Sequence, residues 1–117
     1  MLTSLEIAKA VQEGELLVAL EVFTSHPLYV YARVDSGASM SSIDYRLVSM
    51  ITEYSDDTIV YTDRTKVIKS SLGKEERSVV VTTFTWNDSE FVLEMNSADR
   101  SKVSCPILLG RDWLGTN

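Results

Sequence analysis

The sequence has a single cysteine, Cys105, and a single histidine, His26. One cysteine cannot form a disulfide within the chain, and one cysteine with one histidine is too few for the nitrogen and sulfur ligands of a zinc site. The HExxH motif of zinc peptidases is also missing. The composition therefore predicts no metal and no other cofactor.

Long hydrophobic runs and basic clusters are missing as well. No segment approaches the roughly 18 apolar residues of a membrane helix, and the start, MLTSLEIAKAVQEG, lacks the basic residues and apolar core of a signal peptide. We therefore expect a cytoplasmic protein without membrane contact. The 11 basic residues are scattered and the net charge is −6, so nucleic acid is not an expected partner, because binding to phosphates depends on clustered cations.

The 117 residues, 44% of them hydrophobic, are enough for one domain with a core and too few for two. Stretches rich in β-branched and aromatic residues predict strands at 15–23, 28–34, 58–62, 66–70, 77–86 and 90–95. The tripeptide NDS between the last two is typical of a hairpin turn. The short strands and short loops predict an all-β domain with an antiparallel or mixed sheet.

Three segments depart from the strand pattern. Residues 3–13 predict a short helix, because a possible capping box precedes apolar residues at helical spacing and Gly14 ends the run. This helix is either an arm that packs on the domain or part of a dimer interface. Residues 42–50 place Ile43, Leu47 and Met50 at helical spacing, and a single helical turn or an irregular loop fits this stretch as well as a helix does. Residues 106–114 predict a buried strand, a glycine turn and the start of a short helix.

The stretch RVDSGAS contains the residue of greatest chemical interest, Asp35. Alone, Asp-Ser-Gly is a common turn, and Asp35 is either a turn residue or a catalytic carboxylate. Much later in the chain comes ILLGRDWL. The two segments, in this order and in a β-rich chain of this length, resemble those of the retropepsin-like aspartic proteases.

This resemblance implies that Asp35 is catalytic and that Ser36, Gly37 and Ala38 complete the active-site loop. We expect Gly37 to allow positive φ and a close approach of the loop amides to the carboxylate. The Ser36 hydroxyl, at a position where threonine is more usual, can bridge to a neighbouring loop. The small Ala38 leaves room for the substrate backbone.

The resemblance also implies a supporting loop, Leu109, Gly110, Arg111 and Asp112, behind the catalytic aspartate. Viral retropepsins carry an acid that pairs with this arginine, but the equivalent position here is Ser39. The candidate partners of Arg111 are therefore Asp44, Asp112 or a substrate. The alternative is a structural arginine that ties loops together.

A narrower resemblance links ARVDSGASMSSID, KSSLGKEERSVVVTT and ADRSKVSCPILLGRDWL to the RimB-like family, which is named for ATP-dependent zinc proteases although its motifs are those of aspartic proteases. It implies a substrate with an acidic or glutamate-rich tail. Arg77, Arg100 and Arg111 could bind its carboxylates, although the net charge of −6 opposes long-range attraction. The ending LLGRDWL also resembles protease domains of retroelements.

Together these features predict a retropepsin-like single-lobe barrel at residues 15–117, with an N-terminal helical arm at 1–14 and a short C-terminal helical turn. Because the chain has one Asp-Ser-Gly and aspartic proteolysis needs two carboxylates, the expected enzyme is a homodimer that hydrolyses peptides with one Asp35 from each chain. Residues 58–77 are the expected flap over the site. The alternative is a non-catalytic dimerisation or peptide-binding module on the same fold.

Overall fold

The structure, a computed structural model, describes residues 3, 5, 8, 12, 14–23, 26–70 and 73–115. Its elements are β1 (Glu15–Phe23), β2 (His26–Val34), β3 (Ser42–Asp44), α2 (Tyr45–Tyr54), β4 (Ile59–Ser70), β5 (Gly73–Trp86), β6 (Ser89–Ala98), β7 (Ile107–Leu109) and α3 (Arg111–Leu114). The predicted helix at 3–13 falls in a segment with only isolated described residues. That helix, and with it the arm at 1–14, therefore lies outside what the structure describes.

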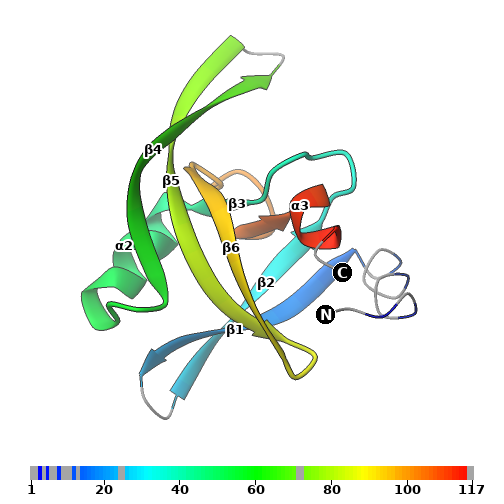
Figure 1. The fold of residues 1–117 in the computed structure, drawn as a ribbon, viewed down its shortest axis with the longest axis vertical. Coiled ribbons are helices and arrows are strands. Elements are labelled where there is room, and N and C mark those ends of the chain that lie inside the picture. Colours follow the sequence, from blue (N-terminus) through cyan, green and yellow to red (C-terminus); the bar gives the residue numbers. More distant parts are fainter. Residues whose placement is uncertain are drawn as a thin grey trace.

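The strands form one mixed sheet in the order β1-β2-β7-β3-β6-β5-β4. A further antiparallel pairing between β1 and β5, at Ala19 and Thr85, closes six of these strands into a barrel and leaves β4 outside it (Figure 1). The pairs β2–β7 and β3–β6 are parallel. The predicted β-barrel is thus confirmed.

The core follows from alternation along the strands. In β1, Leu16, Val18 and Leu20 are buried, whereas Leu17 between them is 49% exposed. Trp113 of α3 is also fully buried, among aromatic side chains of β5 and β6. The barrel interior is therefore a packed apolar core.

Helix α2 settles the open question at residues 42–50. Asp44 ends β3 and caps the helix, since its side chain accepts a hydrogen bond from the Arg46 amide. The helix packs on the barrel through Leu47, Val48 and Ile51. The helical alternative is therefore correct from Tyr45 onward, whereas residues 42–44 belong to β3.

The long hairpin of β4 and β5 extends beyond the barrel (Figure 1). The two strands predicted at 58–62 and 66–70 are one continuous strand, because a register shift between Tyr61 and Thr65 absorbs the irregular residues. The predicted turn between β5 and β6 is confirmed, with positive φ at Asn87 and Asp88. Within the described residues no helix could span a membrane, and no three ligand-type side chains gather to hold a metal.

Candidate active site

Asp35 is the first residue after β2 and is half-buried. Strands β2 and β7 run parallel with Val34 beside Leu109, and the Asp35 amide donates a hydrogen bond to the Leu109 carbonyl at 2.9 Å. The two distant segments that suggested a shared site are therefore adjacent. The hydrogen bond to Leu109 holds the Asp35 backbone against β7 at the point where the Asp35 loop leaves β2.

The loop closes on its own carboxylate. The Gly37 amide donates to Asp35 Oδ1 at 2.9 Å, and the Ala38 amide donates to the Asp35 carbonyl at 3.2 Å. The prediction of positive φ at Gly37 is wrong, since Gly14 and Gly73 are the described glycines with that conformation. The expected close approach is confirmed, because a Cβ at Gly37 would lie 3.1 Å from Asp35 Oδ1.

Gly110 lets the supporting loop pass directly behind the Asp35 loop. A Cβ at Gly110 would lie 2.6 Å from the Ala38 carbonyl oxygen, and that oxygen is held by the Arg111 amide at 2.8 Å. Backbone atoms cannot move aside as a flexible side chain can. Any side chain at position 110 would therefore collide with the Ala38 backbone. The φ of Gly110, −96°, is one that other residues adopt, so space and not backbone conformation requires glycine here.

Arg111 ties the two loops together through backbone carbonyls. Its Nη1 lies 3.3 Å from the Ser36 oxygen and 3.4 Å from the Gly37 oxygen. The two predicted carboxylate partners are wrong. Asp44 pairs instead with Arg46 at 2.7 Å, and the hydrogen bond from Arg46 lowers the pKa of Asp44. The alternative of a structural, loop-binding arginine is confirmed.

Asp112 binds a residue that the sequence did not single out, Ser41. Its carboxylate accepts hydrogen bonds from the Ser41 amide at 2.9 Å, the Ser41 hydroxyl at 2.7 Å and the Trp113 amide at 2.8 Å. The Ser41 hydroxyl also accepts from the Gly110 amide at 3.0 Å. The predicted bridging hydroxyl was Ser36, but within the described residues no hydrogen bond involves the Ser36 hydroxyl, and Ser41 bridges the loops.

A groove of about 330 Å³ lies beside the Asp35 loop. The loop contributes Gly37 and Ala38 to its lining, the β4–β5 hairpin contributes Arg77, and the loop after β6 contributes Arg100. Asp35 itself is not among the lining residues. The groove is thus bounded on one side by the carboxylate-bearing loop and on the other by two arginines.

Both arginines are partly engaged by the protein. Arg77 donates to Asn96 Oδ1 at 2.9 Å and to Glu75 at 3.2 Å, while its Nε is buried without a hydrogen-bond partner. Arg100 donates through Nε to the Cys105 carbonyl at 2.9 Å. Burial lowers the pKa of the Arg100 guanidinium, and the neighbouring Arg77 charge lowers it further. Two cationic side chains therefore line one groove, and of these Arg77 is already paired with the Glu75 carboxylate.

Asn96, like Ser41, is a residue of the candidate site that the sequence analysis did not single out. Its side-chain oxygen accepts from Arg77 and from the Ser42 hydroxyl at 2.8 Å, and its side-chain nitrogen donates to the Ser41 carbonyl at 3.0 Å. It is 1% exposed. The sequence offered one indication of a buried polar residue, because Asn96 directly follows Met95, the last residue of a predicted strand. It could not indicate which residues in distant segments Asn96 would contact.

No protein-family model and no curated protein matches the chain. Solved structures do. The Simian Foamy Virus (mac) protease matches with a TM-score of 0.56 and 20% identity, over 88% of this chain and 97% of the viral one. A Legionella pneumophila subsp. pneumophila str. Philadelphia 1 protein of unknown function (DUF785) matches with a TM-score of 0.54 and 17% identity, over 86% and 83% of the two chains. The barrel, with its Asp35 loop backed by the glycine of the supporting loop, is therefore similar in fold to a retroviral, retropepsin-like protease.

Proposed function

We propose that the chain is an aspartic peptidase that hydrolyses peptide bonds as a homodimer. The observation that carries this proposal is the half-buried Asp35, which is held by the Gly37 amide at 2.9 Å on a loop that borders a groove. The similarity in fold to a viral protease supports it. The non-catalytic binding module remains the alternative.

Two carboxylates would share one proton across the two-fold axis of the dimer. Because two negative charges close together are costly, one carboxyl group stays protonated and polarises the scissile carbonyl, and the other accepts a proton from the attacking water. Each chain contributes its own Asp35, since the sequence has no second Asp-Ser-Gly or Asp-Thr-Gly. The exposed Ser36 hydroxyl would be available to the partner's loop.

The β4–β5 hairpin would act as a flap over the bound peptide. It supplies Ile68, Lys69 and Arg77 to the groove beside the Asp35 loop. A second groove of about 620 Å³ is bordered by Arg64, Thr65 and Lys66 of the same hairpin. The two grooves share Ser39 and Met40, so an extended peptide could run past the loop beneath the hairpin. The tip at residues 71–72 lies outside the described residues.

Mixing wild-type chains with Asp35→Asn chains tests whether two copies form the site. When equal amounts are refolded together, random pairing places half of the wild-type chains in mixed dimers, so cleavage should fall to about half of that of the wild-type chains alone. Initial rates on a fluorogenic peptide would measure this. Unchanged cleavage on addition of the mutant would show that single chains are active, and would overturn the dimeric site.

A preference for acidic substrates is the finer part of the proposal, and it rests on Arg77 and Arg100. Both arginines line the groove, and the Arg77 guanidinium is shared with Glu75 at 3.2 Å. A carboxylate entering the groove would accept charge-assisted hydrogen bonds from the guanidinium N–H groups, which are stronger than hydrogen bonds between neutral groups. The resemblance to the RimB-like family points to the same substrates, and membership of that family is itself part of this proposal.

Replacing Arg100 by Gln should reduce the preference for a glutamate-containing peptide over its glutamine analogue by about tenfold, because a charge-assisted hydrogen bond is lost. The measurement is the ratio of kcat/KM for the two peptides. Lys102→Gln is the matched control, since it removes the same charge from an exposed residue of the same loop. If both variants still cleave peptides and the ratio of kcat/KM for the two peptides is unchanged, the proposed preference for acidic substrates is wrong. The peptidase proposal would not be affected.

A further inference from the structure

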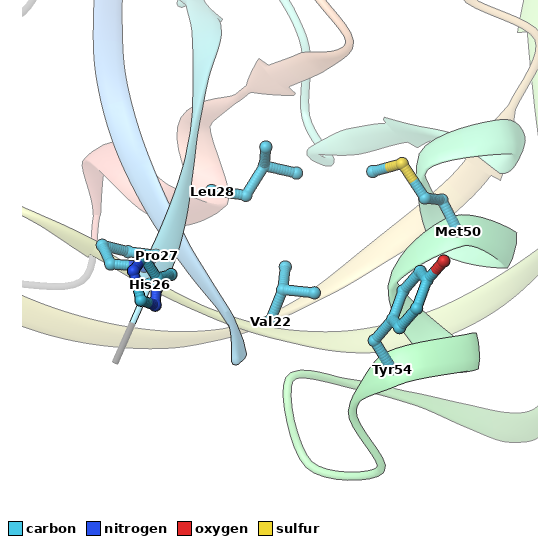
Figure 2. Close-up of a pocket in the computed structure, with 6 residues that line it drawn as sticks. All are labelled: Val22, His26, Pro27, Leu28, Met50 and Tyr54. Carbon is cyan, nitrogen blue, oxygen red and sulfur yellow. The ribbon is translucent and has the colours of Figure 1, made fainter. Parts of the chain in front are cut away.

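An apolar pocket of about 240 Å³ lies at the other end of β2 from Asp35. It is lined by Val22, His26, Pro27, Leu28, Met50 and Tyr54 (Figure 2). Strand β2 has nine residues, so its first residues lie roughly 25 Å from the Asp35 loop at about 3.3 Å per residue. The pocket is therefore separate from the candidate active site.

The walls of this pocket come from two elements that do not close on each other. Figure 2 shows Met50 and Tyr54 projecting from α2 toward Val22 and Leu28 of the β1–β2 hairpin. Met50 is 42% exposed and Tyr54 is 57% exposed, although the neighbouring Ile51 is fully buried. The volume is below the roughly 300 Å³ at which sites for whole small molecules begin, and it suits a single large side chain.

Negative charge borders the pocket. An adjoining pocket of about 380 Å³ shares Val22 and Tyr54 with it and is lined by Glu21, Asp56 and Asp57. No ion pair between described residues involves these three carboxylates. Helix α2 ends here without a basic residue in its last turn, so the negative end of its dipole adds to the field.

We propose that this surface binds a segment of a partner protein in which one bulky apolar or aromatic side chain is flanked by lysine or arginine. The apolar side chain enters between Met50 and Leu28, and the cations lie against Glu21, Asp56 and Asp57. The charges decide between partners, because an acidic segment would be repelled at the rim and a neutral one would gain nothing from it. The chain's net charge of −6 also favours encounter with a basic segment.

Binding of synthetic peptides to the full chain tests this proposal. The probe is Gly-Lys-Lys-Phe-Lys-Lys-Gly, blocked at both ends, and the matched peptides replace its phenylalanine by alanine or its lysines by glutamates. In the Asp35→Asn background, which prevents cleavage, the first peptide should bind at least about tenfold more tightly than either of the others in titration calorimetry. Amide NMR signals of Val22, Leu28 and Tyr54 should shift, and that of Gly37 should not.

Two pairs of variants locate the contacts. Tyr54→Ala should weaken binding about tenfold, whereas Tyr45→Ala, which removes another exposed tyrosine of α2 outside the pocket, should not change it. Asp56→Asn with Asp57→Asn should weaken binding about fivefold at low salt, and the loss should shrink as salt is added. Asp63→Asn with Asp88→Asn is the control of equal charge at exposed positions elsewhere.

Several results would overturn the proposal. Equal affinity for the phenylalanine and alanine peptides would mean that only surface charge attracts the probe. Equal affinity for the lysine and glutamate peptides would mean that the acidic rim has no role. Self-association that Tyr54→Ala abolishes, without peptide binding, would identify a second copy of the chain as the occupant.

Discussion

Replacing Asp35 by Asn is expected to reduce peptide cleavage by about 10³-fold or more, because asparagine cannot accept a proton from the attacking water. The loop should persist, since the asparagine oxygen can still accept the Gly37 amide hydrogen bond that measures 2.9 Å. The measurement is turnover of a fluorogenic peptide library from acidic to neutral pH. Unfolding by urea, followed in parallel, should show that the variant remains folded.

The matched control is Asp99→Asn, which removes the same charge from an exposed carboxylate that accepts a hydrogen bond from the Ser101 amide. We expect its cleavage rate to stay within about twofold of wild type. Equal activity of wild type and Asp35→Asn would identify the activity as a contaminant and refute the peptidase proposal. Peptide binding without cleavage in either protein would favour the non-catalytic binding module.

Replacing Trp113 by Ala is expected to lower the free energy of unfolding by about 4 kcal/mol. The indole is 0% exposed and makes edge-to-face contacts with Trp86 at 5.6 Å and Phe91 at 5.7 Å between ring centroids. Helix α3 has only four residues, too few to be stable without tertiary packing. Trp113 therefore anchors the segment that holds Gly110 and Asp112 against the Asp35 loop.

Urea unfolding of three variants would measure this role. Trp113→Phe keeps an aromatic ring and should lose about half as much stability as Trp113→Ala. Val103→Ala, at a position 52% exposed, should change stability by no more than about 0.5 kcal/mol. If Trp113→Ala were no more destabilised than Val103→Ala, α3 would be held by its hydrogen bonds alone.

The alternation of apolar and polar residues predicted most strands correctly. Prediction failed where one stretch of similar spacing contains two elements, or where an irregular stretch belongs to one strand. Ile43 and Met50 appeared to share a helical face, but Ile43 is a core residue of β3 and Met50 lies at the surface of α2. The polar residues between 62 and 66 suggested two strands, whereas a bulge lets β4 continue through them. Alternation and spacing report local periodicity, and they contain no information on where the chain changes direction in three dimensions.

The sequence by itself linked Asp35 to Gly110 through the resemblance of RVDSGAS and ILLGRDWL to the two loops of retropepsin-like proteases, and the two segments are adjacent in the fold. The tertiary structure alone decided the side-chain partners. It directs Arg111 to carbonyls of the Asp35 loop and Asp112 to Ser41, one of several serines in that stretch. A hydrogen bond depends on the distance and direction between two groups, and only the folded chain fixes these for segments that are far apart in sequence.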